Sequence, residues 1–209
     1  MDGDPHAIRS VHDLRAIVGE PAPRVLAKET PALDERCSAY IASSPFLLLA
    51  TTAADGSCDV SPKGGPPGFA LVPAPDRILL PEFPGNRRLD GVQNLVERTG
   101  IGLIFLIPGI SETLRVNGRG MLTRDPALLE RCAVDGRAPW FCIDVAIQQV
   151  FSHCGKAFLR SHLWEPESWP DPAGVRSPSN TISTRAREQG RSEPEVRREV
   201  EDEYRPVLY

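Results

Sequence analysis

The segment Gly85-Asn86-Arg87-Arg88 combines residue types that can hold a phosphate group. Glycine and asparagine tolerate the backbone geometry of a tight turn and of a helix cap. The apolar spacing that follows predicts a helix from Arg87 to about Glu97. Two arginines in its first turn have the wrong sign for the helix dipole unless an anion lies there. The residues alone leave an alternative open, in which both arginines face water and the dipole merely tolerates them.

Lys63 is the second candidate for anion binding. It ends a predicted strand and enters a glycine- and proline-rich loop, residues 64–68, where the backbone can approach a ligand closely. A lysine there can reach a phosphate as a point charge, although strand-end lysines commonly face water. Thr51 and Thr52 belong to the same predicted β-hairpin, and their hydroxyl groups can also face a ligand.

Other catalytic templates do not fit this chain. Gly118-Arg119-Gly120 lacks the third glycine and the following helix of a dinucleotide fingerprint. Residues 109–113 lack the second glycine of a nucleophile elbow. His153-Cys154 is better explained as a partly buried turn than as a base beside a thiol, because sequence neighbours seldom have that geometry. No side chain is therefore assigned a catalytic role.

The cysteines indicate reduced thiols. There are five, an odd number, and none forms a C-x-x-C pair. A disulfide framework and a structural zinc site are both disfavoured, and no metal ligands are predicted.

The elements that must position these residues are mostly short strands. Apolar runs and turn signals predict strands over residues 46–52, 59–62, 69–72, 77–80, 101–107, 112–123 and 140–151. Helical spacing predicts helices after Ser10, Asp34 and Asp125 as well as over 87–97. A mostly antiparallel pattern with a helix between strands favours a closed or partly closed barrel and disfavours a doubly wound sheet.

Composition limits the classes of function. The net charge of -4 and the pI of about 5.6 argue against nucleic-acid binding. The longest apolar run, residues 101–107, is far shorter than a membrane helix. The acidic N-terminus lacks the pattern of a signal peptide, so we expect a cytoplasmic protein without a membrane partner.

Four segments in order resemble the pyridoxamine 5'-phosphate oxidase-like, FMN-binding split-barrel proteins. They are most similar to a bacterial subgroup of probable FMN-dependent enzymes that differs from the true vitamin B6 oxidase. The segments are Ser61-Pro62-Lys63-Gly64, Pro84-Gly85-Asn86-Arg87-Arg88, residues 112–118, and His153-Cys154-Gly155-Lys156-Ala157 with Arg160-Ser161 and Leu163-Trp164.

The resemblance implies an α+β fold, mainly β, with a Greek-key split barrel and a homodimer that holds FMN in clefts at the subunit interface. Lys63, Arg87 and Arg88 would bind the phosphate and nearby ribityl oxygens, with Asn86 shaping the turn and Ser61 in the same binding segment. The isoalloxazine would meet three threonines of the barrel, Thr51, Thr52 and Thr113. Lys156 and Trp164 would come from the second subunit and close the site.

The implied function is that of a flavin-dependent oxidoreductase acting on a small molecule. The chain shows no match to the C-terminal arginine-and-histidine segment that binds the B6 phosphate, and it carries acidic Glu201-Asp202-Glu203 there instead. Two alternatives stay open: a barrel that uses a deazaflavin or haem, and a non-catalytic flavin-binding protein. We expect an N-terminal helical segment packing on the barrel (1–44), the FMN-binding barrel (45–165) and a charged C-terminal tail (166–209).

Overall fold

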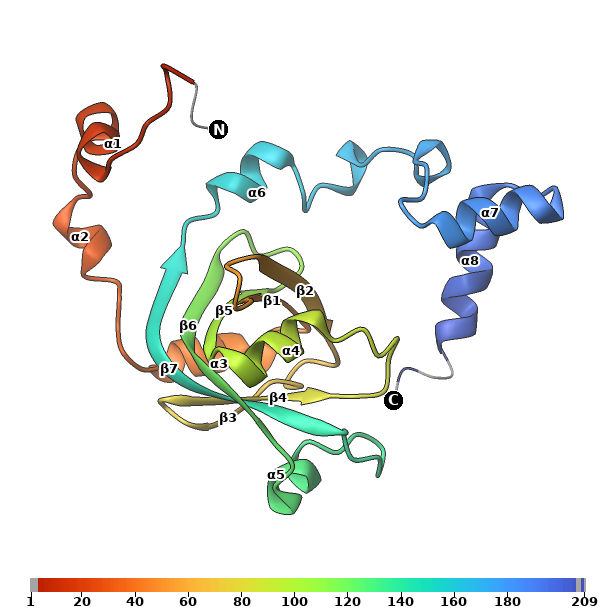
Figure 1. Cartoon of the computed structure of the whole chain (residues 1–209), viewed down its shortest axis with the longest axis horizontal. Helices are drawn as coiled ribbons and strands as arrows, with labels where there is room; N and C mark the ends of the chain where they lie inside the picture. Colours follow the sequence, from red (N-terminus) through yellow and green to blue (C-terminus); the bar gives the residue numbers. More distant parts are fainter. Residues whose placement is uncertain (1–3, 206–207, 209) are drawn as a thin grey trace.

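Seven antiparallel strands form a single sheet in the computed structural model, which describes residues 4–205 and 208 (Figure 1). The strand order is β2-β1-β5-β6-β7-β4-β3. In chain order the strands are β1 (Phe46–Thr52), β2 (Cys58–Gly64), β3 (Leu71–Ala74), β4 (Arg77–Glu82), β5 (Gly100–Leu106), β6 (Thr113–Thr123) and β7 (Phe141–His153). Among the described residues the edge strands β2 and β3 do not pair with each other, so the barrel is split and the sheet is not closed.

Some of the helices pack against this sheet, and others lie away from it (Figure 1). They are α1 (Val11–Val18), α2 (Pro23–Leu26), α3 (Glu35–Ser43), α4 (Asp90–Glu97), α5 (Pro126–Arg131), α6 (Lys156–Ser161), α7 (Asn180–Gln189) and α8 (Glu193–Tyr204), with short 3-10 turns η1 (Pro166–Ser168) and η2 (Pro172–Gly174). α3 contacts β3 and β6, whereas α4 contacts β1, β2 and β6. The predicted α+β class is confirmed. None of the helices described here is long and apolar enough to cross a membrane.

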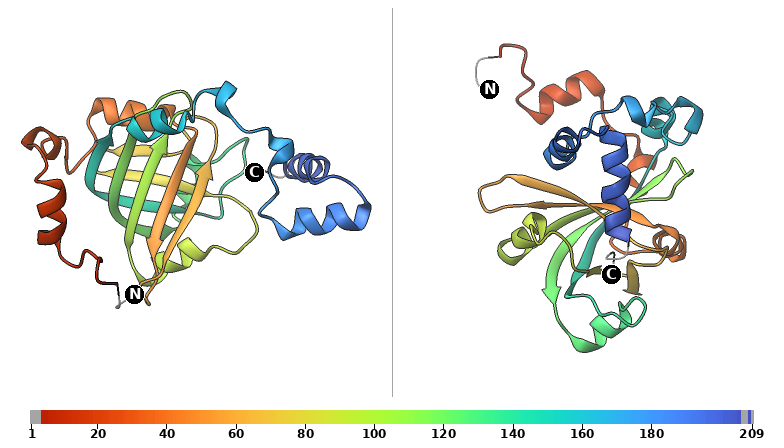
Figure 2. Two further views of the ribbon diagram at one scale, coloured as in Figure 1. Left: turned by 90° about the horizontal axis from the view of Figure 1, so that it is seen from above. Right: turned by 90° about the vertical axis from the view of Figure 1, so that its right-hand side faces the viewer.

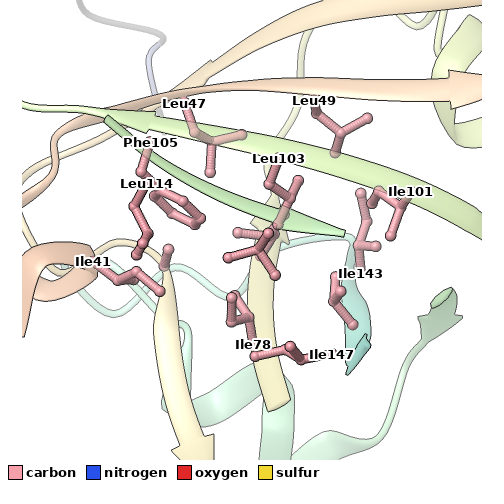
Figure 3. Close-up of a cluster of buried hydrophobic side chains, with 14 of the residues drawn as sticks. Ile41, Leu47, Leu49, Ile78, Ile101, Leu103, Phe105, Leu114, Ile143 and Ile147 are labelled. Atoms are coloured by element: carbon pink, nitrogen blue, oxygen red, sulfur yellow. The ribbon is translucent and has the colours of Figure 1, made fainter. Parts of the chain in front are cut away.

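The core lies between the two halves of the curved sheet (Figure 3). Leu47 and Leu49 of β1 and Leu103 of β5 are completely buried, because alternate residues of each strand face inward. Ile78 of β4 meets them from the other half of the sheet. Burying each of these aliphatic side chains stabilises the fold by roughly 1.5–3 kcal/mol.

A single glycine lets the long strands β6 and β7 bend. Their register shifts between Asn117 and Gly118. A Cβ on Gly118 would lie 2.2 Å from the carbonyl oxygen of Ala146, so no larger residue fits without moving the backbone. Irregularities of this kind increase the local twist of a strand. The curvature seen in Figure 2 brings both halves of the sheet around one core.

Two predicted boundaries were wrong near the phosphate-binding candidates. β2 extends to Gly64, so Lys63 lies within the strand opposite Leu47 and not in the loop. α4 begins at Asp90, because Arg87 and Leu89 have φ angles of 63° and 54°. A left-handed backbone at two alternate residues cannot continue a right-handed helix, so the arginines precede its first turn.

The segments on either side of the barrel are also helical. α1 extends away from the barrel (Figure 1), and its apolar Val11 and Ile17 are 73% and 68% exposed. In the segment expected as a charged tail, α7 and α8 form a hairpin that buries Val196. Neither helix was predicted from the sequence. The chain ends at 1–3, 206–207 and 209 lie outside the described residues.

Candidate functional site

The candidate site lies along β2, the edge strand of the sheet. Asp59, Ser61 and Lys63 are partly buried, whereas the residues between them are exposed. They stand opposite inward-facing residues of β1, since Lys63 pairs with Leu47 and Asp59 with Thr51. These three polar side chains therefore form one row on the inner face, beside the open edge where β2 has no neighbouring strand.

Lys63 is held by a carboxylate at one end of this row. Its Nζ donates to both carboxylate oxygens of Glu82, at 2.7 and 2.6 Å. The two side chains are only 17% and 12% exposed, so water screens the pair weakly. Glu82 is the last residue of β4, and the pair thus joins the two halves of the sheet. No sequence pattern predicted this partner, because the two residues lie on different strands.

At the other end of the row, α4 is fastened to both β1 and β2. The side-chain amide of Asn94 donates to Thr51 Oγ1 at 3.0 Å and to Asp59 Oδ2 at 2.7 Å. Gly91 allows this close approach, because a Cβ there would lie 3.2 Å from Thr51 Oγ1. Asn94 was not predicted as part of the site either. It is a polar residue on the buried, apolar face of a predicted helix, and a buried polar side chain needs a hydrogen-bond partner.

The arginine loop, residues 83–89, connects these two anchor points. It starts after Glu82, beside Lys63, and ends where α4 begins, beside Asp59. Both of its ends are therefore fixed beside β2, on which Ser61 lies between Asp59 and Lys63. The charge of Asp59 also contributes to the raised pKa of Arg88, which indicates that Arg88 lies near this strand.

Within the arginine loop, Asn86 stabilises the turn and leaves one cation uncommitted. Asn86 Oδ1 accepts from the backbone N–H of Arg88 at 3.0 Å. Arg88 pairs with Asp90, which raises the pKa of its guanidinium, and Asp59 adds a smaller contribution. Arg87 is exposed and makes no ion pair with any described residue. No side chain caps the N-terminus of α4, which follows directly.

The charges along this edge are balanced. Three cations, Lys63, Arg87 and Arg88, face three carboxylates, Glu82, Asp59 and Asp90. An anion that enters must compete with Glu82 for Lys63 and with Asp90 for Arg88. The Arg88 pair is exposed and opens at little cost, since surface ion pairs contribute about 0–1 kcal/mol. The buried Lys63 pair is the stronger competitor.

The two threonines of β1 do not present their hydroxyl groups to one ligand. Thr51 is 3% exposed and faces inward, where its oxygen accepts from Asn94. Thr52 is exposed on the outer face, with its oxygen 3.8 Å from Cys58 Sγ. Consecutive strand residues point to opposite faces, so these two hydroxyl groups lie on opposite faces of the sheet. The implied contact of the two threonines with a flavin, through hydroxyl or backbone groups, stays a prediction.

Thr113, Lys156 and Trp164 lie away from the arginine loop. Thr113 is on β6, three strands from Lys63 and on the opposite face of the sheet by register. Trp164 stacks on Phe158 with ring centroids 5.7 Å apart, and its Nε1 donates to the carbonyl of Ile110 at 3.0 Å. Figure 2 shows α6, which starts at Lys156, at the other end of the barrel from α4.

A cavity of about 640 Å³ lies beside Thr113. Tyr40 of α3 and His153 of β7 also line it, and the Tyr40 hydroxyl donates to the carbonyl of Glu112 at 2.7 Å. Burial lowers the pKa of His153, and the nearby Arg115 lowers it further. The imidazole is therefore neutral at neutral pH. This cavity has the size of a small-molecule site, and sequence reasoning did not assemble it.

The sequence model of the family described as pyridoxamine 5'-phosphate oxidase matches residues 33–154, more than half of the 209-residue chain. The matched range contains the whole candidate site along β2. It also contains the residues that line the cavity, apart from Gly155 and three in the α2–α3 linker, Ala27, Lys28 and Thr30. No curated protein matches the chain.

Several solved structures are similar to the barrel. A putative pyridoxamine 5'-phosphate oxidase from Lactobacillus delbrueckii is 21% identical, with a TM-score of 0.46 over 58% of this chain and 95% of that one. An FMN-binding protein from Syntrophomonas wolfei is 12% identical, with a TM-score of 0.42 over 56% and 82%. HupZ from Group A Streptococcus is 15% identical, with a TM-score of 0.47 over 57% and 98%.

Proposed function

Because the chain belongs to the pyridoxamine 5'-phosphate oxidase family through residues 33–154, we propose that it is a flavoprotein that binds FMN. One observation carries the proposal: Lys63, on the inner face of the edge strand β2, pairs with Glu82, the residue directly before the arginine loop, inside the family-matched region. Cationic side chains, a hydroxyl and unpaired backbone N–H groups gathered at one edge are the donors that a phosphate monoester needs.

The residues of this edge fit a flavin phosphate. Arg87 has no competing ion pair among the described residues, and the uncapped start of α4 offers backbone N–H groups of the right polarity. Asn86 keeps the turn in shape through its contact with the Arg88 backbone. These groups hold the phosphate together with Lys63, and Ser61 belongs to the same binding segment.

We further propose a homodimer with FMN at the subunit interface. The outer face of the sheet supports this proposal, because Phe46, Leu48 and Val60 are 37%, 36% and 64% exposed on neighbouring strands. A second copy that covers this face would bring its own Lys156 and Trp164 towards the flavin. The exposed apolar face would then be buried, as expected for a permanent dimer.

The proposed activity is that of a flavin-dependent oxidoreductase with a small-molecule substrate. Bound FMN would supply hydride or electron transfer, and the protein would bind it, orient it and exclude water. Among the described residues we assign no catalytic acid or base. We propose no particular substrate.

The first test is the absorbance spectrum of the purified protein together with mass identification of any ligand that co-purifies. FMN predicts a flavin doublet and the mass of FMN. A deazaflavin predicts a single band, and haem predicts a Soret band. Colourless protein that takes up no FMN on reconstitution would overturn the proposal. Bound FMN that neither NADH nor NADPH reduces would favour the non-catalytic alternative.

A further inference from the structure

We infer that Glu82 is a specificity-determining residue of the flavin site, which weakens phosphate binding by holding Lys63. The inference rests on the proposed function and concerns how strongly the site distinguishes FMN from riboflavin, its unphosphorylated form. Its basis is the Lys63–Glu82 pair, in which one ammonium contacts both oxygens of one carboxylate at 2.7 and 2.6 Å.

Burial makes this carboxylate important. Glu82 and Lys63 are 12% and 17% exposed, whereas Arg88 and Asp90 in the other ion pair of this edge are 78% and 40% exposed. Interactions between charges strengthen as water is excluded, and salt screens buried pairs less than exposed ones. Of the two paired carboxylates, Glu82 therefore opposes an incoming phosphate more strongly than Asp90 does.

The position of Glu82 makes its effect selective for FMN over riboflavin. Glu82 contacts Lys63 and is the last residue before the arginine loop, so its charge lies at the start of the segment that carries Arg87 and Arg88. A phosphate monoester carries nearly two negative charges at neutral pH and is repelled by this carboxylate. Riboflavin carries no charge there, so its binding is indifferent to Glu82. The pair thus sets the difference in affinity between the two flavins.

The experiment compares dissociation constants of FMN and riboflavin for apoprotein, measured by quenching of flavin fluorescence. Glu82→Gln removes the charge and frees Lys63, and we expect FMN to bind at least about fivefold more tightly. Riboflavin affinity should change by less than about twofold. Glu97→Gln is the matched control, because it makes the same change of charge at an exposed residue in the last turn of α4.

A second pair of variants keeps the inference testable if Glu82→Gln leaves Lys63 buried without a partner and the protein fails to fold. Lys63→Gln alone leaves Glu82 charged and without its partner. We expect it to weaken the binding of FMN more than the binding of riboflavin. Adding Glu82→Gln to Lys63→Gln should restore part of that loss. The melting temperature of each apoprotein identifies the folded variants.

The outcomes separate this inference from the proposed function. If wild-type apoprotein binds neither flavin, the proposed function is overturned and the inference with it. If wild-type apoprotein binds both flavins, three results of Glu82→Gln overturn only the inference. These are an unchanged affinity for FMN, a lower affinity for FMN, and an equal change in the affinities for FMN and riboflavin. A selective gain for FMN that Glu97→Gln does not reproduce supports it.

Discussion

The side-chain amide of Asn94 donates to the carboxylate of Asp59 at 2.7 Å and thereby ties α4 to the edge strand β2. The same nitrogen donates to Thr51 Oγ1 on the neighbouring strand. One buried side chain thus joins three elements and fixes the C-terminal end of the arginine loop. We therefore expect the proposed phosphate-binding geometry to depend on this contact, although Asn94 itself is not expected to touch the ligand.

Replacing Asn94 should damage both stability and flavin binding. Asn94→Ala leaves Thr51 and Asp59 without their donor, and we expect the free energy of unfolding to fall by about 1–3 kcal/mol. FMN affinity should fall as well, because the arginine loop loses its anchor. Urea unfolding and fluorescence titration measure the two effects. An unchanged unfolding midpoint would show that the buried network contributes nothing, and exposed Glu97→Ala provides the control.

Removing both loop arginines should release the cofactor's phosphate. Charge-assisted hydrogen bonds contribute about 1.5–3 kcal/mol each, so Arg87→Ala with Arg88→Ala should weaken FMN binding by about 100-fold or more. Riboflavin binding should change much less, and the salt dependence of FMN binding should become shallower. Arg24→Ala, in α2, tests the loss of an arginine elsewhere. Equal losses for FMN and riboflavin would contradict a phosphate site at this loop.

A charge on the outer face of the sheet should prevent dimerisation. Val60 is 64% exposed on β2, and Val60→Lys places a cation in the proposed interface, where an unpaired charge is costly. We expect sedimentation analysis to show a shift from dimer to monomer, accompanied by loss of FMN. Val96→Lys is the control, since Val96 is 74% exposed on α4 and away from this face. A variant at Val60 that stays dimeric would show that the interface lies elsewhere.

The bend in β6 and β7 should not tolerate a methyl group. Gly118→Ala places a Cβ 2.2 Å from the carbonyl oxygen of Ala146, and backbone must move to relieve the contact. Overpacking of this kind typically costs about 1–3 kcal/mol. Gly100→Ala is the comparison, because a Cβ there meets nothing within 4 Å. Thermal unfolding should separate the two variants, and equal melting temperatures would contradict the proposed role of Gly118.

Asp34 should give a pH-dependent contribution to the stability of α3. Its carboxylate accepts from the N–H of Cys37 at 2.7 Å, and this bond, followed by contact with Arg36, lowers its pKa from 3.8 to about 2. The contribution is complete above pH 3.8 and disappears as the pH falls towards 2. Asp34→Asn keeps a capping side chain but cannot titrate. The free energy of unfolding of this variant should therefore lack the pH dependence that Asp34 contributes. Denaturation curves collected across that interval measure the difference.

Local residue patterns were sufficient for much of the fold. The apolar run in Phe46–Thr52 predicted β1 with its observed bounds, because strand burial depends on residues close together in sequence. Asp34 and Asp125 were identified as helix caps from their own neighbours alone. The helices α7 and α8 were missed, because their mean hydropathy is low and Val196 provides one of the few apolar anchors between them.

The sequence by itself determined which residue types are available for an anion: a lysine on one strand and two arginines after a glycine and an asparagine. Only the tertiary structure decided what surrounds them. The partner of Lys63 is Glu82, 19 residues away, and the anchor of the loop is Asn94, which reaches back 43 residues to Thr51. No local pattern encodes such contacts, because they arise when a curved sheet and a helix pack together and buried polar groups must find partners.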